Sequence, residues 1–281
     1  MNDAVLKAGV IGWPIDHSLS PPLHDFWLKQ YQIDGEYLPF AVEPQNLETF
    51  LKNLADGGRR GTNVTLPHKE ATLTIVDHAD DLARKIGAVN TVVVQDDGTL
   101  HGSNTDSYGF LENLKDHQPQ WRASAGSAVV LGAGGAARAI VVALQNAGAP
   151  EIILLNRTKS RAEKLARELG GDIKVDDWDN RADVLAATAT LVNTTSLGMQ
   201  GQPPLEIDLE KLPGAALVTD IVYRPFETEL LKNAKARGNP TVNGLGILLH
   251  QARPGFAAWF GVEPEVSDEL RSHILSVMAG H

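Results

Sequence analysis

The sequence predicts an α/β protein with two domains, each built on a mostly parallel sheet. Strand-like and helix-like segments alternate from the start of the chain, which favours layered α/β architecture. The polar residues Thr105-Asp106 separate two series of alternating strands and helices. In the second series, a glycine-rich turn at 132–136 joins a strand to a helix. We place the first domain at 1–106 and the second at 107–240, and we expect 241–281 to return to the first domain.

The first series begins with a short apolar strand and a capped helix. Ser20 is expected to cap a helix that starts at Pro21 and runs to about Ile33. Asp97-Gly98 should turn the last two strands into a hairpin at the sheet edge. The expected strands cover 8–12, 37–42, 62–65, 88–95 and 100–102, with a helix at 47–55 and another opened by Pro67.

The second series repeats the alternation, and Gly238-Asn239-Pro240 is expected to end its sheet. Two helices should follow, with a kink or break in the first at Pro254. The expected strands cover 128–131, 151–155, 190–195 and 217–221, and the expected helices 108–115, 138–146, 161–169, 228–237, 245–260 and 268–278.

The turn Gly132-Ala133-Gly134-Gly135-Ala136-Ala137 has the G-x-G-x-x-A form that binds a dinucleotide between a strand and a helix. Gly132 permits the tight turn, and Gly134 lets backbone N–H groups approach a pyrophosphate at the helix N-terminus. A bulky side chain at Gly134 should block the cofactor. The second domain is therefore predicted to be a Rossmann domain.

The next strand ends at Asn156-Arg157-Thr158, where an NAD-binding protein usually places an acidic residue for the ribose hydroxyl. A guanidinium pairs with phosphate, and Arg161 follows one helical turn after Arg157, so both are expected to face one anion. The predicted cofactor is NADP.

Composition excludes several classes of function. The 281 residues contain 43% hydrophobic residues, no stretch long enough to span a membrane and no signal-peptide pattern, so we expect a cytoplasmic protein. The absence of cysteine excludes disulfides and thiolate chemistry. A formal net charge of −10 without a basic run argues against nucleic acid as a partner. His17, His24 and His68 lack metal-ligand spacing, and we expect no metal.

Polar clusters lie at strand ends in the first domain. Ligands of open α/β sheets bind beyond the carboxyl ends of strands, so Thr65, Lys69, Asn90 and Asp106 are expected to converge on one crevice. Lys69 suits the role of a general acid/base beside a nicotinamide, with Asp106 orienting it. Taken alone, each residue is more typical of a solvated helix start or of a turn than of a functional site.

Together these motifs resemble shikimate dehydrogenase, from about Val10 to Gln251. The motifs that carry the resemblance occur in family order: Ser18-Leu19-Ser20-Pro21, Asn63-Val64-Thr65, Pro67-His68-Lys69, Gly87-Ala88-Val89-Asn90-Thr91, Asn104-Thr105-Asp106, the Gly132 turn, Asn156-Arg157-Thr158, Asn193-Thr194-Thr195-Ser196-Leu197-Gly198-Met199 and Asn243-Gly244-Leu245-Gly246.

The resemblance implies NADP-linked interconversion of 3-dehydroshikimate and shikimate in aromatic amino-acid and chorismate biosynthesis. It implies that Ser18 and Ser20 hold the substrate carboxylate and that Lys69 and Asp106 are the catalytic pair. Further substrate contacts would be Thr65, Asn90, Tyr223 and Gln251. Ile221 and Gly244 match positions near the nicotinamide, and Asp81 matches a cofactor-side position without a physical reason in the sequence.

Two departures from the family pattern concern the site. Ile247 stands where Met is frequent, and Ser107 stands where Gly is frequent and adds a hydroxyl beside Asp106. Quinate or an aminoshikimate remains an alternative substrate, since they differ by one ring substituent. A methylenetetrahydrofolate dehydrogenase would give no reason for the Ser18 and Ser20 pair. A non-catalytic NADP sensor is the alternative outside enzymes. The sequence leaves open whether the chain is a monomer or a homodimer.

Overall fold

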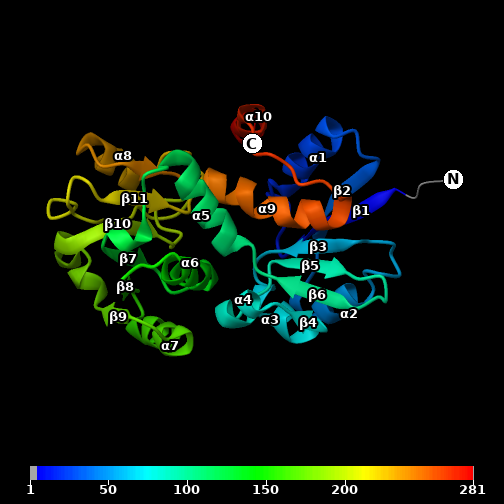
Figure 1. Ribbon diagram of the computed structural model, residues 1–281, viewed down its shortest axis with the longest axis horizontal. Helices are drawn as coiled ribbons and strands as arrows, with labels where there is room; N and C mark the ends of the chain where they lie inside the picture. The colour runs from blue at the N-terminus through cyan, green and yellow to red at the C-terminus, as the bar shows by residue number, and fades with distance from the viewer. Residues whose placement is uncertain (1–4, 281) are drawn as a thin grey trace. The chain divides into compact units, whose positions relative to one another are not determined.

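The computed structural model describes residues 5–280 and divides the chain into two compact units. The first consists of Met1–Thr105 and Leu249–His281, and the second of Asp106–Leu248. Each unit has its own sheet, and helices flank both (Figure 1). The predicted α/β fold class is therefore confirmed.

The sheet of the first unit has the strand order β2-β1-β3-β5-β6-β4. Strand β1 pairs in parallel with both neighbours, whereas β5 runs antiparallel to β3 and to β6. The strands are β1 (Leu6–Gly12), β2 (Gly35–Ala41), β3 (Gly61–Val64), β4 (His78–Ala79), β5 (Thr91–Val94) and β6 (Leu100–Ser103).

The β5–β6 hairpin forms as expected, but its predicted place at the sheet edge is wrong. Strand β4 pairs in parallel with β6 through His78 and Ala79 and so forms the edge. A strand of two residues has no alternation of polar and apolar side chains, which is why no pattern in the sequence indicates it.

The helices of the first unit include the C-terminal segment, which confirms the expected return to the first domain. Trp27 and Trp259 are fully buried there, and the Trp259 indole N–H donates to the Val92 carbonyl oxygen of β5 at 3.1 Å. Helix α9 continues through Pro254, so the break considered there is absent. The helices are α1 (Ser20–Gln30), α2 (Leu47–Lys52), α3 (Lys69–Ile75), α4 (Asp81–Ile86), α9 (Leu245–Phe260), which begins in the second unit, and α10 (Asp268–Ala279).

The sheet of the second unit is parallel throughout, in the order β12-β11-β10-β7-β8-β9. This is the Rossmann arrangement, in which the strand order reverses between β7 and β10. The strands are β7 (Ser127–Leu131), β8 (Ile152–Leu155), β9 (Ile173–Asp176), β10 (Thr188–Asn193), β11 (Leu217–Asp220) and β12 (Thr241–Val242). The helices are α5 (Asp106–His117), α6 (Gly135–Asn146), α7 (Lys159–Leu169) and α8 (Glu229–Ala236).

Two strands of this sheet, β9 and β12, were not anticipated. The expectation that the sheet ends at Gly238-Asn239-Pro240 is wrong, because β12 pairs with β11 beyond that break. Residues 241–248 consequently belong to the second unit, and Asp106 is its first residue, whereas both were expected in the first domain.

Candidate functional site

The glycine turn lies at the carboxyl end of β7, at the point where the strand order reverses. Gly132 has a φ of 110°, a conformation that favours glycine, and a Cβ there would lie 2.6 Å from the Thr194 hydroxyl oxygen. Gly134 precedes the first residue of α6, and a Cβ on Gly134 or Gly135 would meet no heavy atom within 4 Å. The N-terminal face of α6 is thus open within the second unit.

The other residues of the turn differ in exposure. Ala133 is half-buried and Ala136 is exposed, whereas Ala137 is fully buried under the sheet. A small residue at 137 lets the helix pack closely on β7 and β8, as expected for the last position of the motif.

Two exposed arginines follow β8: Arg157 in the turn after the strand and Arg161 in α7. The Asn156 side-chain amide donates to the Thr158 carbonyl oxygen at 2.8 Å and shapes the turn between β8 and α7. Among the residues the structure describes, neither Arg157 nor Arg161 forms an ion pair or side-chain hydrogen bond, so both guanidinium groups are available to an anion. Arg157 precedes α7, which corrects the expectation that the two arginines stand one turn apart on a helix.

A third group of predicted residues follows β11. The Ile221 N–H donates to the Asn193 carbonyl oxygen at 3.1 Å, and the Gly244 N–H donates to the Val222 carbonyl oxygen at 3.3 Å. A Cβ at Gly244 would lie 2.1 Å from the Ile221 carbonyl oxygen, so only glycine permits this approach. The structure thereby brings Ile221, Tyr223 and Gly244 into one region, and burial raises the pKa of Tyr223.

The predicted substrate-side residues of the first unit gather at one end of its central strands. Because β5 runs antiparallel, its first residues lie beside the last residues of β3 and β6. The Val64 N–H donates to the Asn90 carbonyl oxygen at 2.8 Å. The Asn90 N–H donates to the Ser103 carbonyl oxygen at 3.0 Å. Asn90 is thereby held by the backbone on both sides.

The Asn90 side chain connects two further segments. Its amide donates to the Thr105 hydroxyl at 3.0 Å and, at 3.4 Å, to the Gln251 side-chain oxygen on α9. Its own oxygen accepts the Thr105 N–H at 2.8 Å. Asn90 is only 2% exposed, so this network fixes the direction in which each group faces.

A second network passes through Tyr37 and Asn63, neither of which was among the predicted site residues. The Tyr37 hydroxyl donates to the Asn63 side-chain oxygen at 2.6 Å and forms a hydrogen bond with Ser20. The Asn63 amide donates to the Thr91 hydroxyl at 3.1 Å. Burial holds the Tyr37 pKa well above its usual value, so the phenol stays neutral. The sequence signal for this network was a polar Asn63 inside the predicted strand 62–65, and the structure shows strand β3 to be buried.

The expected N-cap role of Ser20 is wrong. Helix α1 begins at Ser20 itself, and the hydroxyl oxygen of Ser18 accepts the Ser20 N–H at 3.2 Å. Pro21 and Pro22 lack an N–H, so the first turn offers few donors for a cap. The Ser20 side chain turns instead to Tyr37.

Thr65 and Lys69 flank the start of α3. A Cβ on Gly12 would lie 2.6 Å from the Thr65 methyl group, so glycine at that position makes room for Thr65. A ring nitrogen of His68 lies 2.7 Å from the Val42 carbonyl oxygen and anchors the helix start. Lys69 is the half-buried first residue of α3, and Asp106 is the half-buried first residue of α5 in the second unit.

Three other residues singled out in the sequence are Asp81, Ser107 and Ile247. Asp81 is exposed at the start of α4 in the first unit, whereas the rest of the predicted cofactor set belongs to the second. The Ser107 hydroxyl donates to the Ala139 carbonyl oxygen on α6 at 2.8 Å, so it joins two helices and is committed there. Ile247 is half-buried in the first turn of α9.

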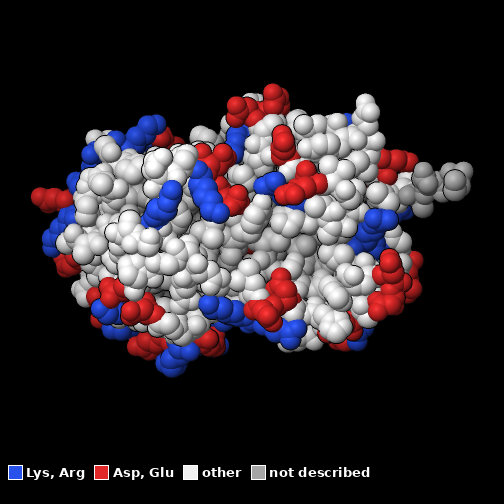
Figure 2. Space-filling view, viewed as in Figure 1, with Lys and Arg blue, Asp and Glu red and all other residues white. Residues whose placement is uncertain are grey.

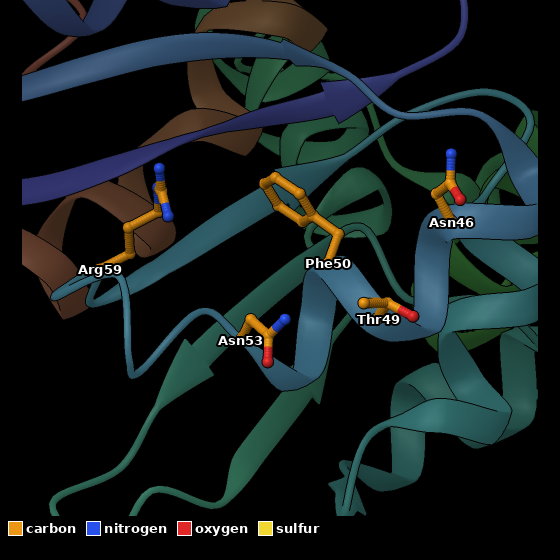
Figure 3. A pocket seen from close by; sticks show the side chains of 5 residues that line it. All are labelled: Asn46, Thr49, Phe50, Asn53 and Arg59. Atoms are coloured by element: carbon orange, nitrogen blue, oxygen red, sulfur yellow. The ribbon is translucent and has the colours of Figure 1, made fainter.

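A cavity of about 320 Å³ in the first unit holds none of these residues. Figure 3 shows Phe50 on α2 and Asn53 just after this helix, on the side of the hollow where Arg59 lies. The Arg59 guanidinium stacks 4.6 Å from the centre of the Phe40 ring. The candidate site therefore rests on the strand ends described above and not on this hollow, which is lined by Asn46, Thr49, Phe50, Asn53 and Arg59.

Within residues 5–280, no three His, Asp or Glu side chains gather in a way that could hold a metal ion. No helix in the same range is long and apolar enough to cross a membrane.

A Rossmann unit with an open glycine turn, joined to an α/β unit with a directional polar network, defines a nucleotide-dependent dehydrogenase of two domains. The family model described as "Shikimate dehydrogenase substrate binding domain" matches residues 10–92, and that described as "Shikimate / quinate 5-dehydrogenase" matches residues 115–199. The chain belongs to the shikimate dehydrogenase family, which confirms the resemblance seen in the sequence.

Relatives cover nearly the whole chain. A shikimate dehydrogenase (NADP(+)) of Paramagnetospirillum magneticum is 60% identical over 98% of this chain and 100% of its own. The structure of shikimate 5-dehydrogenase from Thermus thermophilus with NADP(H) and shikimate has a TM-score of 0.85 and 36% identity, covering 99% of this chain and 100% of that one. Quinate dehydrogenase from Corynebacterium glutamicum with NAD has a TM-score of 0.91 and 33% identity, covering 97% and 99%.

Proposed function

We propose that this protein catalyses the reversible, NADP-dependent reduction of 3-dehydroshikimate to shikimate, a step of aromatic amino-acid and chorismate biosynthesis. The observation that carries the proposal is the full-length similarity to curated relatives named shikimate dehydrogenase (NADP(+)). The second unit then binds the cofactor, and the first unit binds most of the substrate.

The residues present fit NADP. The space beyond Gly134 and Gly135 admits a pyrophosphate to the N-terminus of α6. Arg157 and Arg161 offer guanidinium groups for the 2′-phosphate, and Asn156 and Thr158 shape the turn that presents Arg157. Ile221 and Gly244 line the nicotinamide end. When bound, the reduced cofactor supplies the hydride.

The substrate is held mainly by uncharged groups. Ser18 and Ser20 bind the carboxylate, and Thr65, Asn90, Tyr223 and Gln251 bind the ring hydroxyls. Each buried donor or acceptor left without a partner costs free energy, so a ring that lacks the matching hydroxyl is rejected. The fixed orientation of Asn90 towards Thr105 and Gln251 supports this assignment.

Lys69 acts as the general acid/base. Its ammonium group delivers a proton to the carbonyl oxygen during reduction and recovers it during oxidation. Asp106 orients the ammonium group and accepts a hydrogen bond from the same oxygen once it is a hydroxyl. The anchor between His68 and Val42 supports this role, because it fixes the start of the helix that carries Lys69.

Quinate is the second candidate substrate, since the Corynebacterium glutamicum neighbour is a quinate dehydrogenase. That neighbour was solved with NAD, whereas the arginine after β8 favours NADP here. An aminoshikimate and a non-catalytic NADP-sensing role are the remaining alternatives.

Initial rates with shikimate or quinate, each with NADP or NAD, test the proposal. We expect the highest kcat/KM for shikimate with NADP, followed through the ultraviolet absorbance of the reduced cofactor. A higher kcat/KM with quinate or with NAD would overturn the assignment of substrate or cofactor, and inactivity with every pair would favour the sensor.

The proposed setting is the cytoplasm, with a monomer or homodimer as the working state and no nucleic-acid or membrane partner. Acidic and basic side chains are interspersed on the face drawn in Figure 2, where the described residues form no continuous basic patch. With a formal net charge of −10, local donors have to hold the anionic substrate.

A further inference from the structure

Asp220 is a buried carboxyl group that the proposed reaction does not use. It is the last residue of β11 and has no exposed surface. Its position opposite Asn193 of β10 places it at the carboxyl end of the parallel sheet, where ligands of Rossmann domains bind. A carboxyl group is costly to bury, so its presence needs a reason.

Three donors converge on Asp220. One carboxyl oxygen accepts the Val222 N–H at 3.0 Å and the Asn193 side-chain amide at 3.0 Å. The other accepts the Thr228 hydroxyl at 2.8 Å. Both oxygens are therefore in use, on partners from three different segments of the unit.

Two of these partners lie near the two ends of the loop formed by residues 221–228. Val222 is near its start, and Thr228 is its last residue and also the N-cap of α8, where its hydroxyl accepts the Leu231 N–H. The third partner, Asn193, belongs to β10 and accepts the Ile221 N–H through its backbone oxygen. Asp220 thus holds both ends of the loop to the neighbouring strand.

We propose that Asp220 is a positioning residue that fixes the 221–228 loop so that Ile221 and Tyr223 face the nicotinamide and the substrate. The inference rests on the proposed function of this site. It assigns Asp220 no contact with either ligand, and its effect passes through Val222 and Thr228.

The geometry explains why this position requires a side chain with two polar atoms. Burial raises the pKa of Asp220 to about 6, and the bonds from Val222, Thr228 and Asn193 oppose that rise. Asparagine has the same shape and keeps one oxygen for Val222 and Asn193, while its amide can donate to the Thr228 hydroxyl oxygen. Alanine loses all three contacts.

The test compares Asp220→Ala and Asp220→Asn with a matched control at the other end of the same sheet. Asn239 is also buried, and its amide donates to the Pro213 and Ala216 carbonyl oxygens at 2.8 and 3.0 Å, next to the start of β11. Asn239→Ala therefore removes two buried hydrogen bonds without touching the 221–228 loop.

For Asp220→Ala we expect kcat to fall about tenfold or more, the loss expected for removing a charged hydrogen-bonding group. By calorimetry, the Kd of NADPH should rise several-fold, while that of adenosine 2′,5′-bisphosphate, which lacks the nicotinamide, should stay within about twofold. Asp220→Asn should restore kcat, and Asn239→Ala should lower thermal stability with kcat within about twofold of wild type.

Equal loss of kcat in Asp220→Ala and Asn239→Ala, or an unchanged NADPH Kd in Asp220→Ala, would overturn the inference. If Asp220→Ala does not fold, Thr228→Val removes one partner and should give a smaller loss of kcat, about threefold, in the same direction. Inactive wild-type protein would refute the proposed function, and the two calorimetric affinities would still decide the role of Asp220.

Discussion

The two units hold their functional groups in opposite ways. In the first unit the polar side chains are buried and bonded to one another, as in the networks of Asn90 with Thr105 and of Tyr37 with Asn63. In the second unit the predicted phosphate contacts are the open Gly134 and Gly135 and the exposed Arg157 and Arg161, whose guanidinium groups have no protein partner among the described residues. The first unit therefore holds hydrogen-bonding groups in fixed directions, whereas the second unit leaves open space and positive charge for a ligand.

This difference matches the chemistry of the two proposed ligands. Hydroxyl groups on a ring are distinguished only by donors and acceptors that point in fixed directions, which a buried network provides. Phosphates are bound through charge and backbone N–H groups. Exposed arginines can provide the charge, but the N–H groups can be reached only where no Cβ blocks the approach. Substitutions should therefore act differently in the two units.

The largest expected effect is that of Lys69→Ala in the first unit. Turnover should fall by roughly 10² to 10⁴, because a general acid/base is lost, while KM for shikimate changes far less. Steady-state kinetics measure both values. Lys52→Ala is the control, since Lys52 is an exposed lysine paired with Glu48 in the same unit. Near-normal turnover in Lys69→Ala would remove Lys69 from the mechanism.

Arg157→Asp tests the role of exposed charge in the second unit. We expect the Kd for NADP to rise about 10- to 100-fold, since a charge-assisted contact is replaced by repulsion. The Kd for NAD should change little, and calorimetry measures both. Arg167→Asp, at the exposed far end of α7, is the matched control. Retained preference for NADP in Arg157→Asp would contradict the assignment.

Buried His24 gives the first unit its own pH dependence. Burial lowers the pKa of His24 from 6.5 to about 3, and a weaker polar contact with Asn63 acts in the opposite direction. The His24 ring stacks on the Tyr37 ring, with ring centres 3.7 Å apart. The neutral form of His24 therefore contributes fully to the stability of the fold above pH 6.5, and this contribution is lost as pH falls towards 3.

Between pH 7 and pH 5 the wild-type protein should lose about 2 kcal/mol of unfolding free energy relative to His24→Phe. Phenylalanine keeps an aromatic ring on Tyr37 and does not titrate. Urea unfolding of both proteins across this range measures the difference, and a difference independent of pH would show that His24 does not titrate in this way.

Asn90→Asp tests the directional network of the first unit. It replaces the amide donor that faces Thr105 and Gln251 with an acceptor, so KM for shikimate should rise about tenfold. The Kd for NADP should stay near its wild-type value, because that ligand is assigned to the second unit. Equal weakening of both ligands would indicate a general loss of structure.

Asp220 should give the second unit the opposite pH dependence. Its pKa is raised by burial from 3.8 to about 6, so its neutral form stabilises the fold below pH 3.8 and that stability is lost as pH rises through 6. Relative to Asp220→Asn, the wild-type protein should lose about 1 kcal/mol between pH 5 and pH 7. A gain over this range in urea unfolding would contradict burial as the cause of the raised pKa.

The apolar strand β7 and the glycine turn made the Rossmann unit predictable, because β7 and α6 flank Gly132 in the sequence itself. Strands β4 and β12 escaped detection because each has two residues and forms only through its neighbour. Ser20 was misread as a cap because the local sequence favours capping, while its partner Tyr37 lies on strand β2.

The candidate site shows the same limit. Lys69, Asn90 and Arg157 could be predicted as site residues because their motifs are continuous in the chain. Asp220 was missed because its partners are of ordinary residue types and belong to no motif with it: Asn193 is 27 residues away and Thr228 8 residues away. Supporting contacts of this kind depend on tertiary structure, which local patterns do not encode.

A crystal structure of the protein with shikimate and NADP bound tests the central claim most directly. The account predicts that Lys69 and Asp106 both hydrogen-bond the hydroxyl of the carbon that faces the nicotinamide, while Arg157 contacts the 2′-phosphate. A complex in which Lys69 or Asp106 points away from that carbon, or in which the cofactor lies elsewhere than at the Gly132 turn, would contradict it.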